Sequence, residues 1–122
     1  MKVIICGAGQ VGYNIARYLA LEDNEVTVVD QSAELSQTIS DTLDVKALVG
    51  FASHPNVLSQ AGADSADMII AVTQSDEVNM VACQVAHSLF NVTTKIARIR
   101  QQGYINPKWS NLYTRDHIPI DV

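Results

Sequence analysis

Short apolar runs alternate with amphipathic segments along the 122 residues of this chain. The apolar run at 3–6 is followed by a segment, 13–20, whose apolar residues recur at helical spacing. The same alternation predicts further strands at 25–29, 45–49, 67–72 and 95–99 and helices at 33–43, 56–61 and 77–90, with a short helix at 109–113 and the start of a sixth strand at 118–122. Strands that alternate with helices are typical of a parallel sheet covered by helices on both faces.

Apolar stripes indicate which face of each predicted helix packs on the sheet. At helical spacing they comprise Val11, Ile15, Tyr18 and Leu19; then Leu35, Ile39 and Leu43; and then Val78, Val81, Ala82, Val85 and Leu89. We expect these side chains to be buried.

A glycine-rich turn separates the first predicted strand from the first predicted helix. It has the sequence Gly7-Ala8-Gly9-Gln10-Val11-Gly12. In such a G-x-G-x-x-G turn the first glycine permits a tight bend, the second lets a diphosphate approach the backbone, and the third lets the helix pack close to the strand. The free N–H groups and the dipole of the helix N-terminus favour an anion there. The turn therefore predicts a dinucleotide site.

An acidic residue ends the second predicted strand. Asp30 lies 18 residues after Gly12, close to the spacing of ~20 expected of the carboxylate that holds a ribose. A carboxylate there accepts hydrogen bonds from both ribose hydroxyls and repels a 2′-phosphate, which favours NAD over NADP. The pattern as a whole indicates an α/β fold of Rossmann type: a doubly wound parallel sheet with strand order 3-2-1-4-5 and a sixth strand beside the fifth.

Composition narrows the functional classes. The net charge of −5 and the lack of a basic run argue against a nucleic-acid-binding surface. No apolar run approaches the ~18 residues of a membrane-spanning helix. Cys6 and Cys83 fall within a predicted strand and a predicted helix, so we expect buried free thiols in a reducing cytosol. No Cys/His spacing predicts a metal site.

The chain contains few residues that could form a catalytic site. An oxidoreductase needs a second region that places its substrate against the nicotinamide, whereas nearly all of these residues belong to the nucleotide fold. His54 and His117 fall in predicted loops and His87 on a predicted helix, and none pairs with an acid at a recognisable reacting centre. We therefore expect a sensor rather than an enzyme.

Residues 1–12 and Val28-Val29-Asp30 resemble TrkA-type RCK (KTN) domains. Similar segments follow at 57–63, 66–67, 71–73, 76–79, 95–100 and 116–122, so the likeness covers the whole chain. Many Rossmann proteins share the glycine motif, and the cluster Thr73, Asp76 and Asn79 is the more specific part. Members of this family regulate potassium uptake systems and potassium channels from the cytosolic side, and they bind NAD(H) or, in some branches, ATP/ADP.

The resemblance implies a cytoplasmic regulatory domain that senses NAD(H). It would lie at the inner face of the membrane through a potassium transporter subunit and form a homo-oligomer, a dimer or a higher ring. Whole TrkA-like proteins carry further regulatory domains, so we expect residues 1–122 to be the N-terminal nucleotide-binding domain of a longer protein. The alternatives are an ATP/ADP-gated regulator and the coenzyme domain of an NAD-dependent dehydrogenase.

Site residues follow from the motif and the resemblance together. We expect the phosphates at Gly7, Gly9, Gln10, Val11 and Gly12, the adenosine ribose at Asp30 with Gln31 and Ser32 nearby, adenine at Ala52 and Ser53, and the diphosphate or second ribose at Thr73, Gln74 and Ser75.

Some roles stay open. Asp76, Glu77 and Asn79 either contact the ligand or cap the helix that they begin. Phe51 stands where many family members have a polar or acidic residue, and it either lines the adenine pocket or covers the core. Arg98 and Arg100 either bind a phosphate, pair with an acid of a second subunit, or form a solvated edge. The resemblance includes Arg98, which favours a ligand role for that residue.

Overall fold

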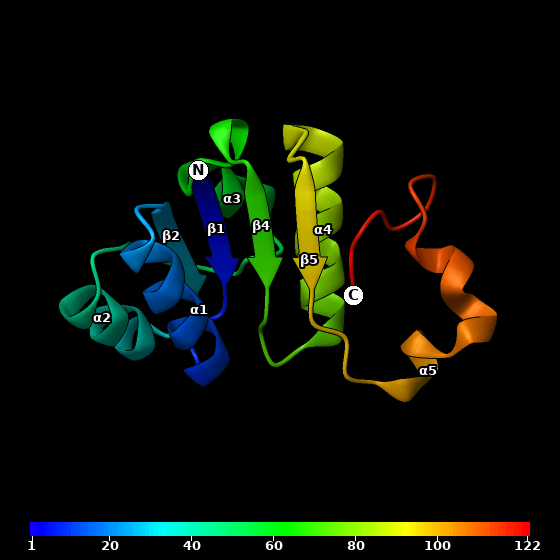
Figure 1. Ribbon diagram of the computed structural model, residues 1–122, viewed down its shortest axis with the longest axis horizontal. Helices are drawn as coiled ribbons and strands as arrows, with labels where there is room; N and C mark the ends of the chain where they lie inside the picture. The colour runs from blue at the N-terminus through cyan, green and yellow to red at the C-terminus, as the bar shows by residue number, and fades with distance from the viewer.

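A five-stranded parallel sheet forms the centre of the computed structural model, which describes residues 1–122 (Figure 1). Its strands are β1 (Lys2–Cys6), β2 (Glu25–Asp30), β3 (Lys46–Val49), β4 (Met68–Ala71) and β5 (Thr94–Ala97). They lie in the order β3-β2-β1-β4-β5, and every neighbouring pair is parallel. The strand order predicted from the sequence is thus confirmed.

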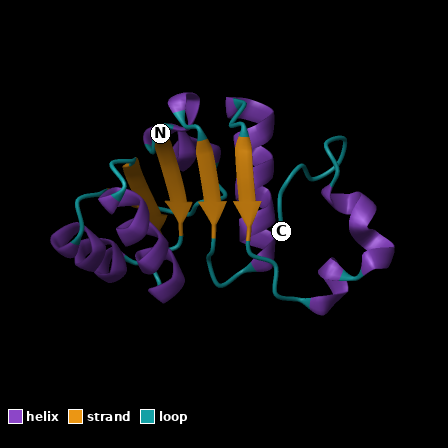
Figure 2. Ribbon diagram, viewed as in Figure 1, coloured by secondary structure: helices purple, strands orange, loops and turns teal.

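Helices cover both faces of the sheet (Figure 2). The helices are α1 (Gln10–Leu21), α2 (Ala33–Thr42), α3 (Pro55–Gln60), α4 (Asp76–Phe90) and α5 (Gln102–Ile105), with 3-10 turns η1 (Ala63–Ser65) and η2 (Pro107–Tyr113). α1 and α2 lie on one face, and α3 and α4 on the other (Figure 1). No helix is both long and apolar enough to cross a membrane.

The strands divide their side chains between two cores, because successive residues of a strand point to opposite faces. In β1, Val3 and Ile5 belong to the cluster under α1 and α2. Ile4 and Cys6 belong to the cluster under α3 and α4, which also contains Cys83. Both cysteines are buried and free, as the sequence predicted.

The apolar stripe predicted for α1 is partly wrong. Val11 and Tyr18 are 43% and 64% exposed, and the buried residues are Gly12 and Ala16. A Cβ on Gly12 would collide with the carbonyl group of Gly7. The helix therefore meets the sheet through its smallest residues, and its larger apolar side chains flank the contact.

The stripes of α2 and α4 need the same correction. Ile39 is buried, but Leu35 is exposed. On α4, Val81 and Leu89 are exposed although both were expected in the core. The buried residues of α4 are instead Asn79, Met80, Ala82, Cys83 and Ala86. Asn79 and the small side chains mark the face that packs most closely on β4 and β5.

The predicted sixth strand is reduced to a single bridge. Asp121 pairs in parallel with Ile96 beside β5, through Asp121 N to Lys95 O at 2.8 Å and Ala97 N to Asp121 O at 2.9 Å. Before this bridge, α5 and η2 extend beyond the edge of the sheet (Figure 1). Ile120 is buried and returns the chain to the core.

Candidate functional site: a pocket at the carboxyl ends of the strands

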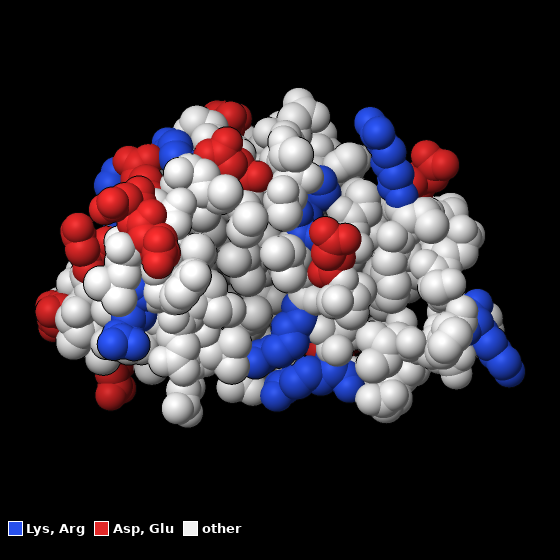
Figure 3. Space-filling view, viewed as in Figure 1, with Lys and Arg blue, Asp and Glu red and all other residues white.

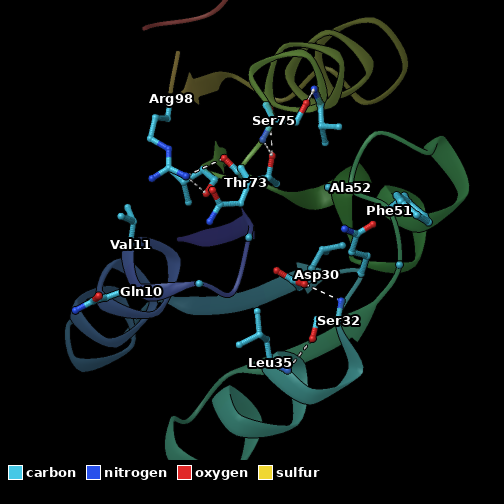
Figure 4. Close-up of a pocket in the computed structure, with 18 of the residues that line it drawn as sticks. Gln10, Val11, Asp30, Ser32, Leu35, Phe51, Ala52, Thr73, Ser75 and Arg98 are labelled. Carbon is cyan, nitrogen blue, oxygen red and sulfur yellow. Dashed lines mark hydrogen bonds between the residues drawn. The ribbon is translucent and has the colours of Figure 1, made fainter. Parts of the chain in front are cut away.

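A pocket of about 510 Å³ opens where the strands end, beside the glycine turn (Figure 4). Its walls come from five stretches of chain: Gly7, Gly9, Gln10 and Val11; Val29 to Ser32 with Leu35; Gly50, Phe51 and Ala52; Val72 to Ser75 with Val78; and Arg98 with Arg100. The sheet order reverses direction between β1 and β4. Such a switch point is where open α/β sheets bind their ligands.

The structure accounts differently for the glycine at each of the three motif positions. Gly7 has φ 115°, and a Cβ there would lie 2.9 Å from the Val72 carbonyl oxygen. Gly12 is required by the contact between α1 and the turn described above. At Gly9, however, a Cβ would meet no atom within 4 Å. Nothing in the fold requires a glycine at position 9, and the open space lies where a ligand could approach the backbone.

The N-terminus of α1 faces this space without a capping side chain. The first helical hydrogen bond runs from Tyr13 N to Gly9 O at 2.8 Å, and Gly9 offers no side-chain acceptor. Gln10 and Val11 line the pocket beside it. Free N–H groups at a helix start, together with the helix dipole, make this part of the pocket suited to an anion.

Asp30 holds the turn in shape with its carboxylate. Its Oδ2 accepts the Ala8 backbone N–H at 2.7 Å, and its Oδ1 accepts the Ser32 N–H at 2.7 Å. Ser32 in turn caps α2 by accepting the Leu35 N–H at 3.1 Å (Figure 4). Each carboxylate oxygen retains a second lone pair. The carboxylate can therefore fix the turn and still accept a hydroxyl from a ligand.

Arg98 brings a positive charge to the opposite wall. Its Nη2 donates to the carbonyl oxygens of Val72 at 2.9 Å and Thr73 at 2.8 Å, and its Nε is buried without a partner. No carboxylate forms an ion pair with this guanidinium. Figure 3 shows basic side chains gathered at this end of the sheet, below β4 and β5. A guanidinium that has N–H donors without a partner and forms no ion pair with a carboxylate is suited to bind a phosphate.

Arg100 also lines the pocket but is exposed. Its Nη2 lies 3.2 Å from Oε1 of Gln74. Together with Asp30 and Arg98, it completes the set of ionisable residues among those that line the pocket. Arg98 and Arg100 both follow β5, and both line the same pocket.

Asp76 and Asn79 do not line this pocket, and their side chains bond to other groups of the protein. Ser75 is the N-cap of α4, accepting the Val78 N–H at 3.2 Å. The Asp76 carboxylate accepts the backbone N–H groups of Arg100 at 3.0 Å and Gln101 at 2.8 Å. These hydrogen bonds, that from Arg100 foremost, lower the pKa of Asp76.

Asn79 is fully buried behind the pocket, where its amide bonds Thr73 and the Arg98 carbonyl. Glu77 lies outside too, with the Tyr104 hydroxyl donating to its Oε2 at 2.9 Å. Among the other predicted residues, Ser53 does not line the pocket, and Gly12 serves the packing of α1.

The far end of the pocket, at β2 and β3, is mostly apolar. Phe51 is 52% exposed and lines the pocket, so of its two proposed roles the structure supports the pocket rather than the core. Leu35 and Val78 line the pocket too, although the sequence assigned both to core stripes. Their position in the first turn of a helix that follows a strand end is the sequence signal that could have found them.

Comparison with known proteins identifies a family model and curated relatives that match this chain. The family model of the TrkA-N domain matches residues 3–112. The Trk system potassium uptake protein TrkA of Azorhizobium caulinodans is 62% identical over the whole chain, and that of Halomonas elongata is 52% identical. The chain spans only 27% and 26% of these two curated relatives.

Among solved structures, the GsuK channel bound to NAD has a TM-score of 0.73 at 20% identity. The match covers 84% of this chain and 18% of that one. At this identity the likeness supports the fold alone.

Proposed function

Since the chain belongs to the TrkA-N domain family, we propose that it is a nucleotide-binding regulatory domain that senses NAD(H) for a Trk-type potassium uptake system. The names of its relatives support the transport assignment, since both are Trk system potassium uptake proteins. The chain corresponds to about a quarter of each relative, so transport control belongs to the longer assembly and nucleotide binding to this domain.

One observation carries the nucleotide assignment. A single pocket contains the Asp30 carboxylate, the uncapped N-terminus of α1, and the Arg98 guanidinium, which forms no ion pair with an acidic residue. We propose that Asp30 holds a ribose and that the diphosphate lies between the N-terminus of α1 and Arg98, which line the same pocket. The open space above Gly9 fits the close approach of phosphate oxygens to the backbone.

Regulation rather than catalysis is favoured by the chemistry of the walls. The ionisable residues that line the pocket are Asp30, Arg98 and Arg100. Asp30 already accepts two backbone N–H groups, and a guanidinium donates hydrogen bonds but has no acceptor, so none of the three is suited to act as a general base. When bound, NAD(H) would supply a nicotinamide whose charge depends on redox state. We propose that Thr73, Gln74 and Ser75, which line the pocket, respond to this difference.

ATP or ADP remains the second candidate ligand, because it shares the adenosine diphosphate that this pocket suits. The observation that favours it is the pair Arg98 and Arg100 on one wall, which could receive a terminal phosphate. A ligand regulates only if it binds two conformations with different affinity. We propose that contacts beyond the diphosphate provide this difference.

The remaining parts of the proposal concern the assembly. We propose a cytoplasmic domain that lies at the inner face of the membrane through a potassium transporter subunit and associates with further copies of itself. The exposed apolar residues Val81 and Leu89 on α4 are compatible with contacts to other chains.

Isothermal titration calorimetry with NADH, NAD⁺, ATP and ADP tests the proposal. We expect NADH or NAD⁺ to bind tightest and the Asp30→Ala variant to lose at least tenfold in affinity. Asp64→Ala, which removes an exposed carboxylate outside the pocket, is the matched control. A preference for ATP or ADP would favour the second candidate. Binding of none of the four ligands would overturn the nucleotide assignment.

A further inference from the structure

Phe51 presents a large aromatic side chain to the pocket instead of burying it. It follows the end of β3 and is 52% exposed. One face of the ring stacks on His54, with the ring centroids 5.3 Å apart and an interplanar angle of 27°. Figure 4 shows Phe51 and Ala52 at the end of the pocket near Asp30 and Ser32.

The backbone around Phe51 keeps the ring in this place. Gly50 N donates to the Asp30 carbonyl at 3.0 Å, and His54 N donates to the Phe51 carbonyl at 3.0 Å. The next residue, Ala52, is 4% exposed and occupies the core position. The chain therefore buries the small residue and leaves the aromatic one at the pocket, backed by an imidazole.

Apart from His54, which stacks on the ring, the lining residues of β3 and its following turn carry apolar side chains. Val29, Leu35, Gly50 and Ala52 line the same end of the pocket, and Ser53 does not line it. The nearest polar lining residues in sequence, Gln31 and Ser32, follow Asp30 on the ribose side. The side chains at this end therefore offer more surface for stacking than groups for hydrogen bonds to the edge of a base.

We propose that Phe51 is the base-stacking residue of this site and that the site selects its ligand by the aromatic face of the base rather than by its hydrogen-bonding edge. The inference rests on the proposed nucleotide function and names the residue that recognises the base. Stacking on an aromatic side chain tolerates different bases because each has a π-face. His54 is a positioning residue, which holds the ring of Phe51 without touching the ligand.

Three probes separate face from edge: ADP, UDP and 1,N6-etheno-ADP, whose added ring blocks the hydrogen-bonding edge of adenine and preserves its face. We expect etheno-ADP to bind within about threefold of ADP, and UDP, with its smaller ring, more weakly. Phe51→Ala should weaken ADP and etheno-ADP about tenfold and reduce the ADP-to-UDP preference. Phe51→Tyr should retain both properties.

Matched variants and a spectroscopic readout guard against an effect on folding. Tyr18→Ala removes a 64% exposed aromatic on α1 outside the pocket and should change nothing. The fluorescence of etheno-ADP should be quenched on binding to the wild type but not to Phe51→Ala. His54→Ala should give a smaller loss than Phe51→Ala, and His54→Phe should restore the affinity.

The outcomes distinguish a failure of the proposed nucleotide function from a failure of base stacking on Phe51. If the wild type binds neither ADP nor NADH, the proposed function fails. If it binds ADP but Phe51→Ala binds equally well, or if etheno-ADP binds far more weakly than ADP, stacking on Phe51 is overturned while the nucleotide function stands.

Discussion

The side-chain oxygen of Asn79 accepts two hydrogen bonds from Thr73, one from the backbone nitrogen at 2.9 Å and one from the hydroxyl at 2.6 Å. The Asn79 amide nitrogen donates to the carbonyls of Thr73 at 3.3 Å and Arg98 at 2.8 Å. The guanidinium of Arg98 donates to the same Thr73 carbonyl. One buried amide thus links α4 to the ends of β4 and β5, directly behind the positive charge of the pocket.

Asn79→Ala is therefore expected to weaken both the fold and the site. It leaves the Thr73 N–H and the Arg98 carbonyl without partners in a buried place, which costs roughly 2–5 kcal/mol of unfolding free energy. Nucleotide affinity should fall as well, because Arg98 loses its support. Chemical denaturation and calorimetry measure the two effects. Asn14→Ala, at an exposed position of α1, is the control. Unchanged affinity in a folded Asn79→Ala variant would contradict the link.

Replacement of glycine by alanine is expected to affect stability very differently at two positions of the glycine motif. Gly12→Ala places a methyl group against the Gly7 carbonyl, so it should prevent α1 from packing and lower the melting temperature strongly. Gly9→Ala meets no protein atom and should leave stability near that of the wild type. If a diphosphate occupies the space above Gly9, this variant should nevertheless lose about tenfold or more in nucleotide affinity. Wild-type affinity in Gly9→Ala would place the ligand elsewhere.

The fold could be predicted from the sequence because its signals are local. The glycine turn, Asp30 at a strand end and the apolar strands each depend on a few neighbouring residues, and together they define the sheet order. The helix faces were harder. Periodicity treats Val11 and Tyr18 as core residues, whereas the close contact of Gly12 with the turn decides which side of α1 meets the sheet.

The pocket brings together most of the predicted site residues and leaves out four of them, Gly12, Ser53, Asp76 and Asn79. Residues of the turn and Arg98 line the pocket as expected. Asp76 and Asn79 carry the right chemistry for a ligand, but Asn79 bonds Thr73 and the Arg98 carbonyl, and Asp76 bonds the backbone of Arg100 and Gln101. The last three partners lie 19 to 25 residues away in sequence. Sequence patterns do not reveal such long-range partners. Phe51 and His54 are only three residues apart, but their stacking depends on side-chain conformation and was visible only in the structure.

The buried thiols predict a loss of stability at high pH. Burial raises the pKa of Cys6 far above its ordinary value of 9.0 and raises that of Cys83 to about 12. Above pH 9 the unfolded chain releases protons that the folded chain retains, so unfolding becomes easier as the pH rises. Each thiol should contribute up to about 1.4 kcal/mol per pH unit in this range.

Urea unfolding between pH 7 and 11 measures this slope. The tyrosines Tyr104 and Tyr113 act in the same direction, since their pKa values are raised by the hydrogen bond to Glu77 and by burial, respectively. The double variant Cys6→Ala/Cys83→Ala should flatten the slope between pH 9 and 10. In the native chain at pH 8 both thiols should resist a disulfide reagent until denaturant is added. Rapid labelling of the folded chain would contradict their burial.

Asp76 predicts an acid-sensitive attachment of the C-terminal segment. Its carboxylate accepts the N–H groups of Arg100 and Gln101, and these bonds lower its pKa from 3.8. A lowered pKa means that the stabilisation is present above about pH 4 and is lost as the pH falls through the folded-state pKa. Amide hydrogen exchange of Arg100 and Gln101 should therefore accelerate below about pH 4, relative to the intrinsic rate.

Asp76→Ala should show this faster exchange already at pH 7 and no further acid dependence at these two amides. The amides of β4 should stay protected, because the loss is local to the segment that follows β5. Asp64→Ala should exchange like the wild type. If Arg100 and Gln101 stay equally protected in Asp76→Ala, other contacts hold this segment, foremost the bond from Tyr104 to Glu77.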